Sequence, residues 1–160
     1  MSVNKAKPHL LVIPEDDANA QLAKGFHLRI TNAERQFQVL PAAGGWSKAV
    51  ESLMRDHLAG LQKYASRHVL LLIDFDQDAT RFQEVQRQIP ESLRDRVFLL
   101  GVWSEPEKLK PSLGKIESIG ERLAQECQTD ALGETWAHAL LKHNLEEARR
   151  LRAIVGGIFF

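Results

Sequence analysis

The segment VLLLIDFDQD, residues 69–78, joins an unbroken apolar run to three acids at alternate positions. Consecutive leucine and β-branched residues are typical of a strand that is covered on both faces, as in a parallel sheet. The segment LLVIPEDD, residues 10–17, has the same plan. In open α/β folds, the carboxyl ends of such strands form the edge of the sheet where ligands bind. The two segments therefore predict an α/β fold with an acidic site at that edge.

Apolar runs and helical periodicity alternate along the rest of the chain. We expect strands at 9–13, 37–40, 68–73 and 96–102, and helices at 16–26, 46–65, 79–88, 116–127 and 134–154. This order predicts right-handed crossovers, with helices on both faces of the sheet. The expected fold is a Rossmann-like three-layer α/β/α sandwich with a four-stranded, mainly parallel sheet and two extra C-terminal helices.

The length of the chain suits one domain with a substantial core. We expect residues 1–160 to form a single domain, with its core at about 8–110 and a helical extension at about 111–160. The chain carries 21 basic and 21 acidic side chains, for a formal net charge of +0. This balance argues against a free-standing nucleic-acid binder, because such proteins carry an excess of positive charge. Contact with DNA or RNA therefore needs a metal ion, a local patch or a partner.

Cysteine usage and hydropathy suggest a compartment. The single Cys127 excludes an internal disulfide and fits a reducing cytosol. No apolar run is long enough to cross a bilayer, so we expect a cytoplasmic protein without a membrane partner. The last seven residues, IVGGIFF, are unusually apolar for a terminus. We expect them to dock on the body of the protein, on a protein partner or on a second copy of the chain.

The acids that follow the two strands are candidate metal ligands and catalytic groups. Glu15, Asp74 and Asp76 follow strands that we expect to be neighbours, so their carboxylates can share one cation. Hard oxygen ligands favour Mg²⁺ or Mn²⁺. Asp16 and Asp17 fit the simpler role of helix caps. Asp74, Asp76 and Asp78 alternate, so a locally extended segment would point them in one direction.

Further residues are candidates for a second ion and for phosphate binding. Asp78 and Glu105 are expected to support a second cation. Gly44 and Gly45 precede a helix and can form an anion nest, to which the Ser47 hydroxyl and the Lys48 ammonium would add. A plain turn also explains the two glycines. An EF-hand loop is excluded, because Ala79 and Val85 occupy the positions that need Gly and Glu.

The acids resemble the TOPRIM pattern of topoisomerases, DnaG-type primases and OLD nucleases. That family has a Glu just past its first strand and an Asp-x-Asp just past its third, which Glu15 and Asp74 with Asp76 match. The glycine turn after the second strand is also common there, and the resemblance covers about residues 8 to 110. The family usually places Gly after its Glu, where this chain has Asp16.

The TOPRIM resemblance implies a function. It implies that Glu15 acts as a general acid or base and that Asp74 and Asp76 hold Mg²⁺ for phosphodiester chemistry. Nuclease members often add an acid and a lysine after strand four, which Glu105 with Lys108 or Lys110 would supply. We therefore expect Mg²⁺-dependent phosphoryl transfer on DNA or RNA, by a nuclease-like domain that works alone or as a subunit of a larger system.

A non-catalytic, partner-binding module is the alternative, either a degenerate TOPRIM-like protein or a receiver-like switch. The acids also resemble those of response-regulator receivers, in which Asp74 would accept a phosphoryl group and Lys110 would match the conserved lysine. Receivers place a fifth strand before that lysine, which the sequence does not show. Haloacid-dehalogenase-type phosphatases use Asp-x-Asp-x-Thr after their first strand, but here the motif comes late and Asp78 takes the place of Thr.

Overall fold

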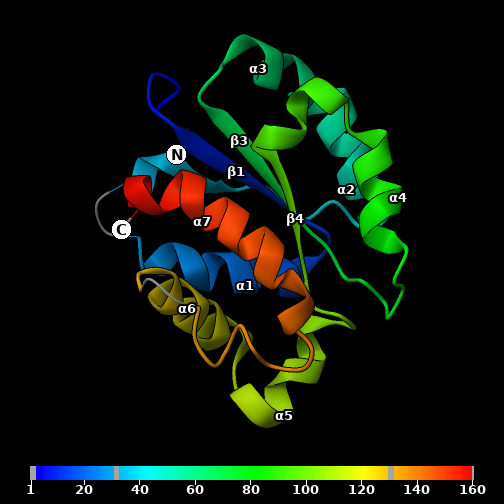
Figure 1. Ribbon diagram of the computed structural model, residues 1–160, viewed down its shortest axis with the longest axis vertical. Coiled ribbons are helices and arrows are strands. Elements are labelled where there is room, and N and C mark those ends of the chain that lie inside the picture. The colour runs from blue at the N-terminus through cyan, green and yellow to red at the C-terminus, as the bar shows by residue number, and fades with distance from the viewer. Residues whose placement is uncertain (1–2, 31–32, 130–131, 160) are drawn as a thin grey trace.

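A four-stranded parallel sheet forms the centre of the computed structural model, which describes residues 3–30, 33–129 and 132–159 (Figure 1). The strands are β1 (His9–Pro14), β2 (Phe37–Val39), β3 (Arg67–Leu72) and β4 (Val97–Leu100). They lie in the order β2-β1-β3-β4, and every pair is parallel. The expected α/β fold is confirmed, and the sheet is parallel throughout.

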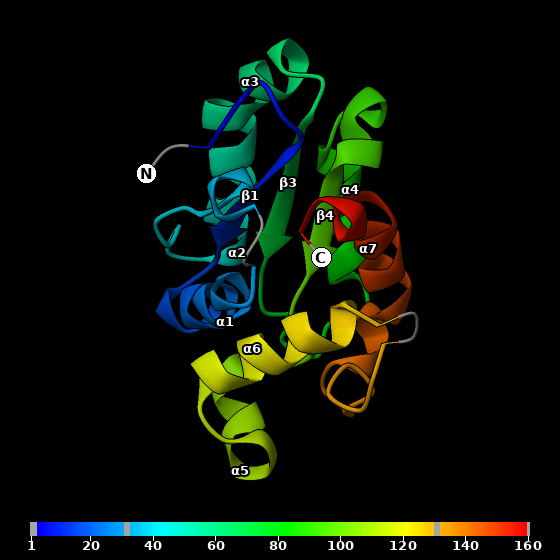
Figure 2. The same ribbon diagram turned by 90° about the vertical axis from the view of Figure 1, so that its left-hand side faces the viewer.

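Helices cover both faces of this sheet (Figures 1 and 2). One layer contains α1 (Asp17–Leu28), α6 (Ile116–Cys127) and α7 (Leu145–Phe159). The other layer contains α2 (Trp46–Ser52), α3 (Leu58–Lys63) and α4 (Arg81–Gln88), and a π-helical turn, Leu53–His57, joins α2 to α3. The short helix α5 (Lys110–Leu113) precedes α6. Among the described residues, no helix has the length and apolar character needed to cross a membrane.

Two hydrophobic cores separate the three layers. Along β1, Leu10 and Val12 face the core beneath α1, α6 and α7, whereas Leu11 and Ile13 face the core beneath the opposite helices. This alternation follows from the two-residue period of a strand. Because both faces are covered, polar side chains at the strand ends, beyond the apolar runs, are the ones available for chemistry.

The C-terminal helices α6 and α7 pack in the same helical layer as α1. Ile119 and Leu123 of α6 and Ala148 and Leu151 of α7 belong to the same core as the β1 side chains. Cys127 is buried there too, and burial raises the pKa of its thiol to about 12. The cysteine is therefore a packed, unreactive side chain in the folded protein.

The predicted helix at 134–154 is wrong in its first half, because α7 begins only at Leu145. The preceding residues form turns that are fixed by contacts with α6. The indole N–H of Trp136 donates to the Leu123 carbonyl at 3.0 Å, and the Thr135 N–H donates to the Glu126 carboxylate at 3.0 Å. These tertiary hydrogen bonds outweigh the helical periodicity of the segment.

Within the apolar C-terminal segment, Phe159 packs on the body of the protein. The buried Phe159 ring lies 5.7 Å from the Phe37 ring, in an edge-to-face arrangement. Phe160 lies outside the described residues. Docking on the body is therefore found for Phe159, and association of this segment with a protein partner or a second copy stays a prediction.

Two glycines allow α1 and α6 to pack backbone against backbone. A Cβ at Gly120 would overlap the carbonyl oxygen of Leu22, and a Cβ at Gly25 would overlap that of Glu117. We expect Gly120→Ala to lower the free energy of unfolding by about 2 kcal/mol, because the helices must move apart. Gly157→Ala is the matched control, since its Cβ meets no atom within 4 Å. Urea denaturation measures both, and equal stabilities would contradict the close packing.

Candidate metal centre

The acids expected to meet do so at the carboxyl edge of the sheet. Pro14, the last residue of β1, pairs with Leu72 of β3, so the residues that follow both strands emerge side by side. The Glu15 N–H continues the ladder by donating to the Leu72 carbonyl at 2.9 Å. The parallel pairing of β1 with β3 therefore brings Glu15 and Asp74 together across 59 residues of sequence.

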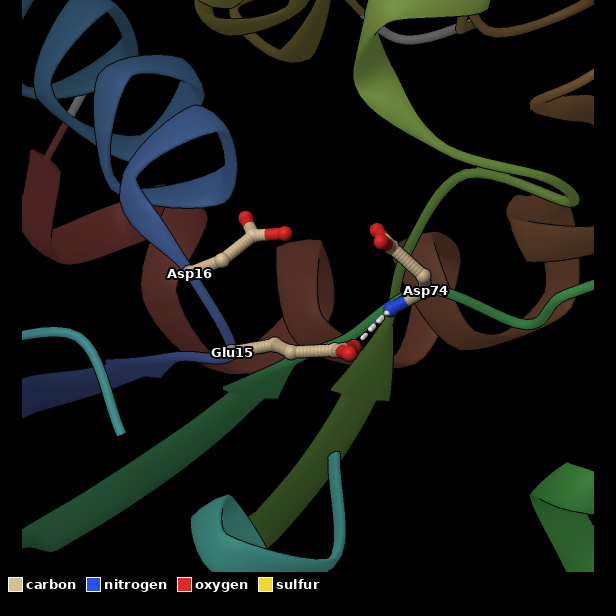
Figure 3. Close-up of side chains that lie close together, drawn as sticks. All are labelled: Glu15, Asp16 and Asp74. Atoms are coloured by element: carbon tan, nitrogen blue, oxygen red, sulfur yellow. Dashed lines mark hydrogen bonds between the residues drawn. The ribbon is translucent and has the colours of Figure 1, made fainter. Parts of the chain in front are cut away.

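Three carboxylates converge at this edge (Figure 3). Glu15, Asp16 and Asp74 each offer an oxygen, and these oxygens all lie within 4.8 Å of one another. Asp74 is only 6% exposed. Its backbone N–H donates to Oε2 of Glu15 at 2.6 Å, which holds the Glu15 side chain across the edge toward β3. The predicted pairing of Glu15 with Asp74 is confirmed as a matter of geometry.

Burial and the charges of neighbouring acids disfavour ionisation of Glu15 and Asp74. Burial, followed by the neighbouring charges of Glu15, Asp16 and Asp76, raises the pKa of Asp74 to about 7. Burial is also the largest cause that raises the pKa of Glu15. A divalent cation would reverse both effects, because it is attracted to the ionised forms. Three hard oxygen donors around one point fit Mg²⁺ or Mn²⁺.

Asp16 caps a helix and also belongs to the cluster. Its extended backbone precedes α1, and its Oδ1 accepts the Asn19 N–H at 2.9 Å. This confirms the interpretation of Asp16 as a cap. Its side chain also supplies one of the three converging oxygens. A residue expected only to begin a helix thus becomes a candidate metal ligand.

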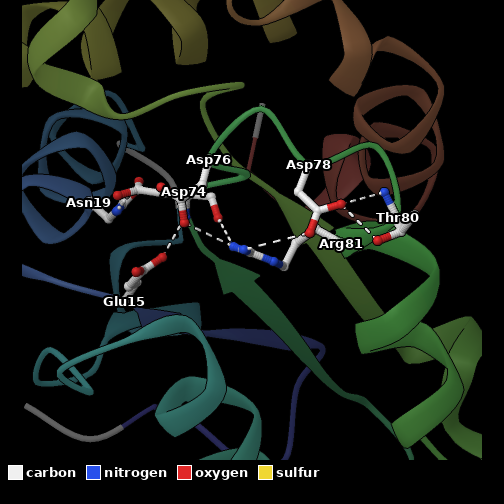
Figure 4. A network of polar contacts seen from close by, with 7 residues as sticks. All are labelled: Glu15, Asn19, Asp74, Asp76, Asp78, Thr80 and Arg81. Atoms are coloured by element: carbon white, nitrogen blue, oxygen red, sulfur yellow. Dashed lines mark hydrogen bonds and ion pairs between the residues drawn. The ribbon is translucent and has the colours of Figure 1, made fainter.

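The segment from Asp74 to Asp78 is not extended, so the expectation that its three aspartates point in one direction is wrong. Asp76 and Gln77 have left-handed backbones, with φ of 49° and 58°, which turn the chain directly after Asp74. The Asp76 carboxylate meets Arg81 at 3.1 Å (Figure 4). Asp78 Oδ1 accepts the Thr80 N–H at 2.9 Å and the Thr80 hydroxyl at 2.7 Å. Ligation of a cation by either aspartate stays a prediction.

Arg81 connects the loop that follows Asp74 to the end of β3, and it was not among the site residues expected from the sequence. The side chain is buried at the start of α4, and its Nη1 donates to the Asp74 carbonyl oxygen at 2.9 Å. The guanidinium also lies 4.3 Å from the centre of the Trp46 ring. Arg81 therefore fixes the backbone that presents Asp74, and it balances part of the negative charge.

The glycine turn at Gly44 and Gly45 hydrogen-bonds to the backbone of Glu15. The N–H groups of Gly44 and Gly45 both donate to the Glu15 carbonyl oxygen, at 2.8 and 3.1 Å. Both glycines have positive φ, of 95° and 151°, a conformation that disfavours other residues. An anion nest requires backbone N–H groups that are free to bind the anion, and these two N–H groups already donate to the Glu15 carbonyl. The observed role of the turn is to fix the backbone of a candidate ligand.

The remaining phosphate-binding and second-ion candidates lie on exposed segments. Ser47 and Lys48 are exposed in the first turn of α2. Glu105 and Lys108 are exposed on the segment that follows β4, where Glu105 precedes a 3₁₀ turn. Among the described residues, only Glu15, Asp16 and Asp74 form a group of three or more potential metal-ligating side chains. Roles for the exposed residues stay predictions.

No family model, curated protein or solved structure matches this chain.

Proposed function

We propose that this protein carries out divalent-metal-dependent phosphoryl transfer on phosphodiesters of DNA or RNA. The observation that carries the proposal is the meeting of the Glu15, Asp16 and Asp74 carboxylates within 4.8 Å at the carboxyl edge of a parallel sheet. Mg²⁺ or Mn²⁺ is the expected cofactor. The resemblance of Glu15 and Asp74 to the acids of TOPRIM nucleases supports the same reaction class.

In this proposal some site residues bind the cation and another transfers a proton. A bound cation would neutralise the phosphate oxygens and stabilise the charge that develops on them. Asp74 and Asp16 suit the role of ligands, because one is buried and the other begins a helix directly beside it. Glu15 suits general acid–base work, since burial moves its pKa upward, toward the operating range of the reaction.

Overall charge explains why the cation is needed for binding as well as for chemistry. The chain has a formal net charge of +0, and the site itself is negative. A polyanion is repelled by this edge until a cation occupies it. We therefore propose that nucleic acid binds only together with the metal, or when a protein partner delivers it.

A cleavage assay tests this function. The protein is incubated with single-stranded and duplex DNA and RNA in Mg²⁺ or Mn²⁺, and the products are resolved on a denaturing gel. We expect cleavage that EDTA abolishes and that Asp74→Ala reduces by about 1,000-fold or more, an effect of the size seen when a charge-stabilising group is removed. Metal-dependent cleavage of unchanged rate in Asp74→Ala would remove Asp74 from the mechanism.

A phosphorylation switch is the second candidate, and one observation favours it. The acids that meet are two consecutive residues after β1 and one residue after β3, whereas Asp76 turns toward Arg81. Receivers carry their acids in this arrangement. Lys110 weighs against this candidate, since it lies in α5 and does not follow a fifth strand within the described residues.

Acetyl phosphate separates the two candidates. A receiver-like switch gains the mass of one phosphoryl group at Asp74, which intact-protein mass spectrometry detects. A nuclease does not. We expect no adduct, and a stoichiometric, Mg²⁺-dependent adduct that Asp74→Asn removes would replace the nuclease proposal with the switch.

A further inference from the structure

Asn19 is a fully buried polar residue beside the acidic cluster. It lies in the first turn of α1, and its side chain is 0% exposed. Buried asparagines are uncommon, because the amide loses its hydrogen bonds to water. The contacts of this amide therefore need a physical reason.

The amide nitrogen of Asn19 contacts two of the three carboxylates, those of Asp16 and Asp74. Figure 4 shows Asn19 beside Asp74. Nδ2 donates to Oδ1 of Asp16 at 2.9 Å and to Oδ1 of Asp74 at 2.9 Å. The two N–H bonds of a single amide are thus divided between an acid that follows β1 and an acid that follows β3. Each carboxylate keeps its second oxygen outside these two hydrogen bonds.

The other end of the same amide is left without a partner. Oδ1 of Asn19 is buried and accepts no hydrogen bond from the described residues. An unsatisfied buried acceptor costs about 1–3 kcal/mol. The amide is oriented so that both of its donors meet acids, at the expense of its acceptor. This unsatisfied oxygen is an observation separate from the distances between the carboxylates. It indicates that the orientation of the amide is set by its hydrogen bonds to Asp16 and Asp74.

We propose that Asn19 is the positioning residue of the metal centre. Its amide holds one oxygen of Asp16 and one of Asp74, so that the second oxygens stay oriented for a shared cation. The inference rests on the proposed metal site. Hydrogen bonds to the ligands of a metal commonly set its affinity, and their loss costs about 10–100-fold.

Metal affinity of substituted proteins tests the role. Asn19→Leu removes the donors and keeps the approximate volume, and Asn19→Ala removes both. Mn²⁺ alone is titrated into each folded protein by isothermal calorimetry. We expect the dissociation constant to rise about 10–100-fold in both variants.

Asn144→Leu is the matched control. Asn144 is also buried and makes two hydrogen bonds, with the N–H of Gly101 at 3.1 Å and its carbonyl at 2.8 Å, but it contacts no acid of the cluster. We expect this variant to lose stability and to keep the wild-type Mn²⁺ affinity. An equal loss of affinity in the control would reduce the effect of Asn19 to general destabilisation and overturn the proposal.

A measurement on the wild-type protein covers the case in which the variants do not fold. The side-chain N–H₂ signals of Asn19 are followed by NMR during titration with Mg²⁺. A positioning amide shifts its signals and stays protected from exchange, because its bonds to the acids persist, whereas loss of protection would overturn the proposal. Mn²⁺ binding that is unchanged in both Asn19 variants overturns the role of Asn19 alone. Absence of Mn²⁺ binding by the wild-type protein overturns the metal centre itself, and the role of Asn19 with it.

Discussion

Asp74→Asn is expected to weaken cation binding strongly while stabilising the metal-free protein at neutral and alkaline pH. Asparagine keeps the shape of the side chain and the acceptor for Asn19, but it removes a charge that burial and three neighbouring acids disfavour. We expect Mn²⁺ affinity to fall by about 100-fold or more, since the most buried ligand is lost. A substitution that raises stability and removes binding is typical of a functional site.

The pH dependence of this stabilisation has a definite sign. The pKa of Asp74 is about 7 in the folded protein, against 3.8 as the reference value. A raised pKa stabilises the fold at pH values below the reference and loses that contribution as pH rises toward 7. The metal-free wild-type protein should therefore lose stability between about pH 4 and pH 7 relative to Asp74→Asn. We expect a difference of about 2 kcal/mol at pH 8, which discounts the full linkage free energy for solvent screening.

Urea denaturation in EDTA at pH 4, 6 and 8 measures the difference. Asp95→Asn is the control for charge removal, since Asp95 is exposed and lies just before β4, at the opposite edge of the sheet. Mn²⁺ affinity of the wild-type protein should rise from pH 6 to pH 8, because the cation competes with the proton on Asp74. Equal stabilities of the wild-type protein and Asp74→Asn at pH 8 would show that ionisation of Asp74 does not destabilise the fold.

Arg81→Ala is expected to cost about 3–4 kcal/mol of folding free energy, the largest stability effect in the site. The substitution leaves the Asp74 carbonyl without its donor and Asp76 without its cation. It also removes the guanidinium that lies 4.3 Å from the centre of the Trp46 ring. A charged hydrogen bond of this kind is worth about 1.5–3 kcal/mol, and a desolvated cation–π contact about 2 kcal/mol.

Thermal and urea unfolding measure the effect, with Arg87→Ala as the matched control on the same helix. Arg87 is exposed, so its loss should change stability by less than about 0.5 kcal/mol. Arg81→Lys should fall between wild type and alanine, because it keeps the charge and loses the planar fork. Equal stabilities of Arg81→Ala and Arg87→Ala would contradict the bracing role of Arg81.

The sequence was sufficient for the sheet because its signals are local and strong. Unbroken apolar runs at β1 and β3 predicted buried parallel strands, and the acids that end them predicted the edge at which Glu15 and Asp74 meet. In a sheet covered on both faces, polar side chains that follow a strand can only lie at the edge of the sheet, so this part of the site was predictable from the sequence.

Residues whose roles depend on tertiary contacts were not predicted. Asn19 sits in an ordinary amphipathic helix, and its importance arises only where α1 meets the end of β3. Arg81 carried one signal, a basic residue in the first turn of a helix, where the dipole disfavours it unless acids are near. The left-handed backbone of Asp76 has no clear sequence signature, so an extended segment was expected there.

The cation itself gives the most direct test of the site. Crystals soaked in Mn²⁺ and measured for anomalous scattering would locate it. We expect a peak between the Glu15, Asp16 and Asp74 carboxylates, with ligand distances of about 2.1–2.3 Å, and loss of that peak in Asp74→Asn. A fully soaked crystal with no peak among these three acids, or with Mn²⁺ bound only elsewhere, would contradict the metal centre and the phosphoryl-transfer function that depends on it.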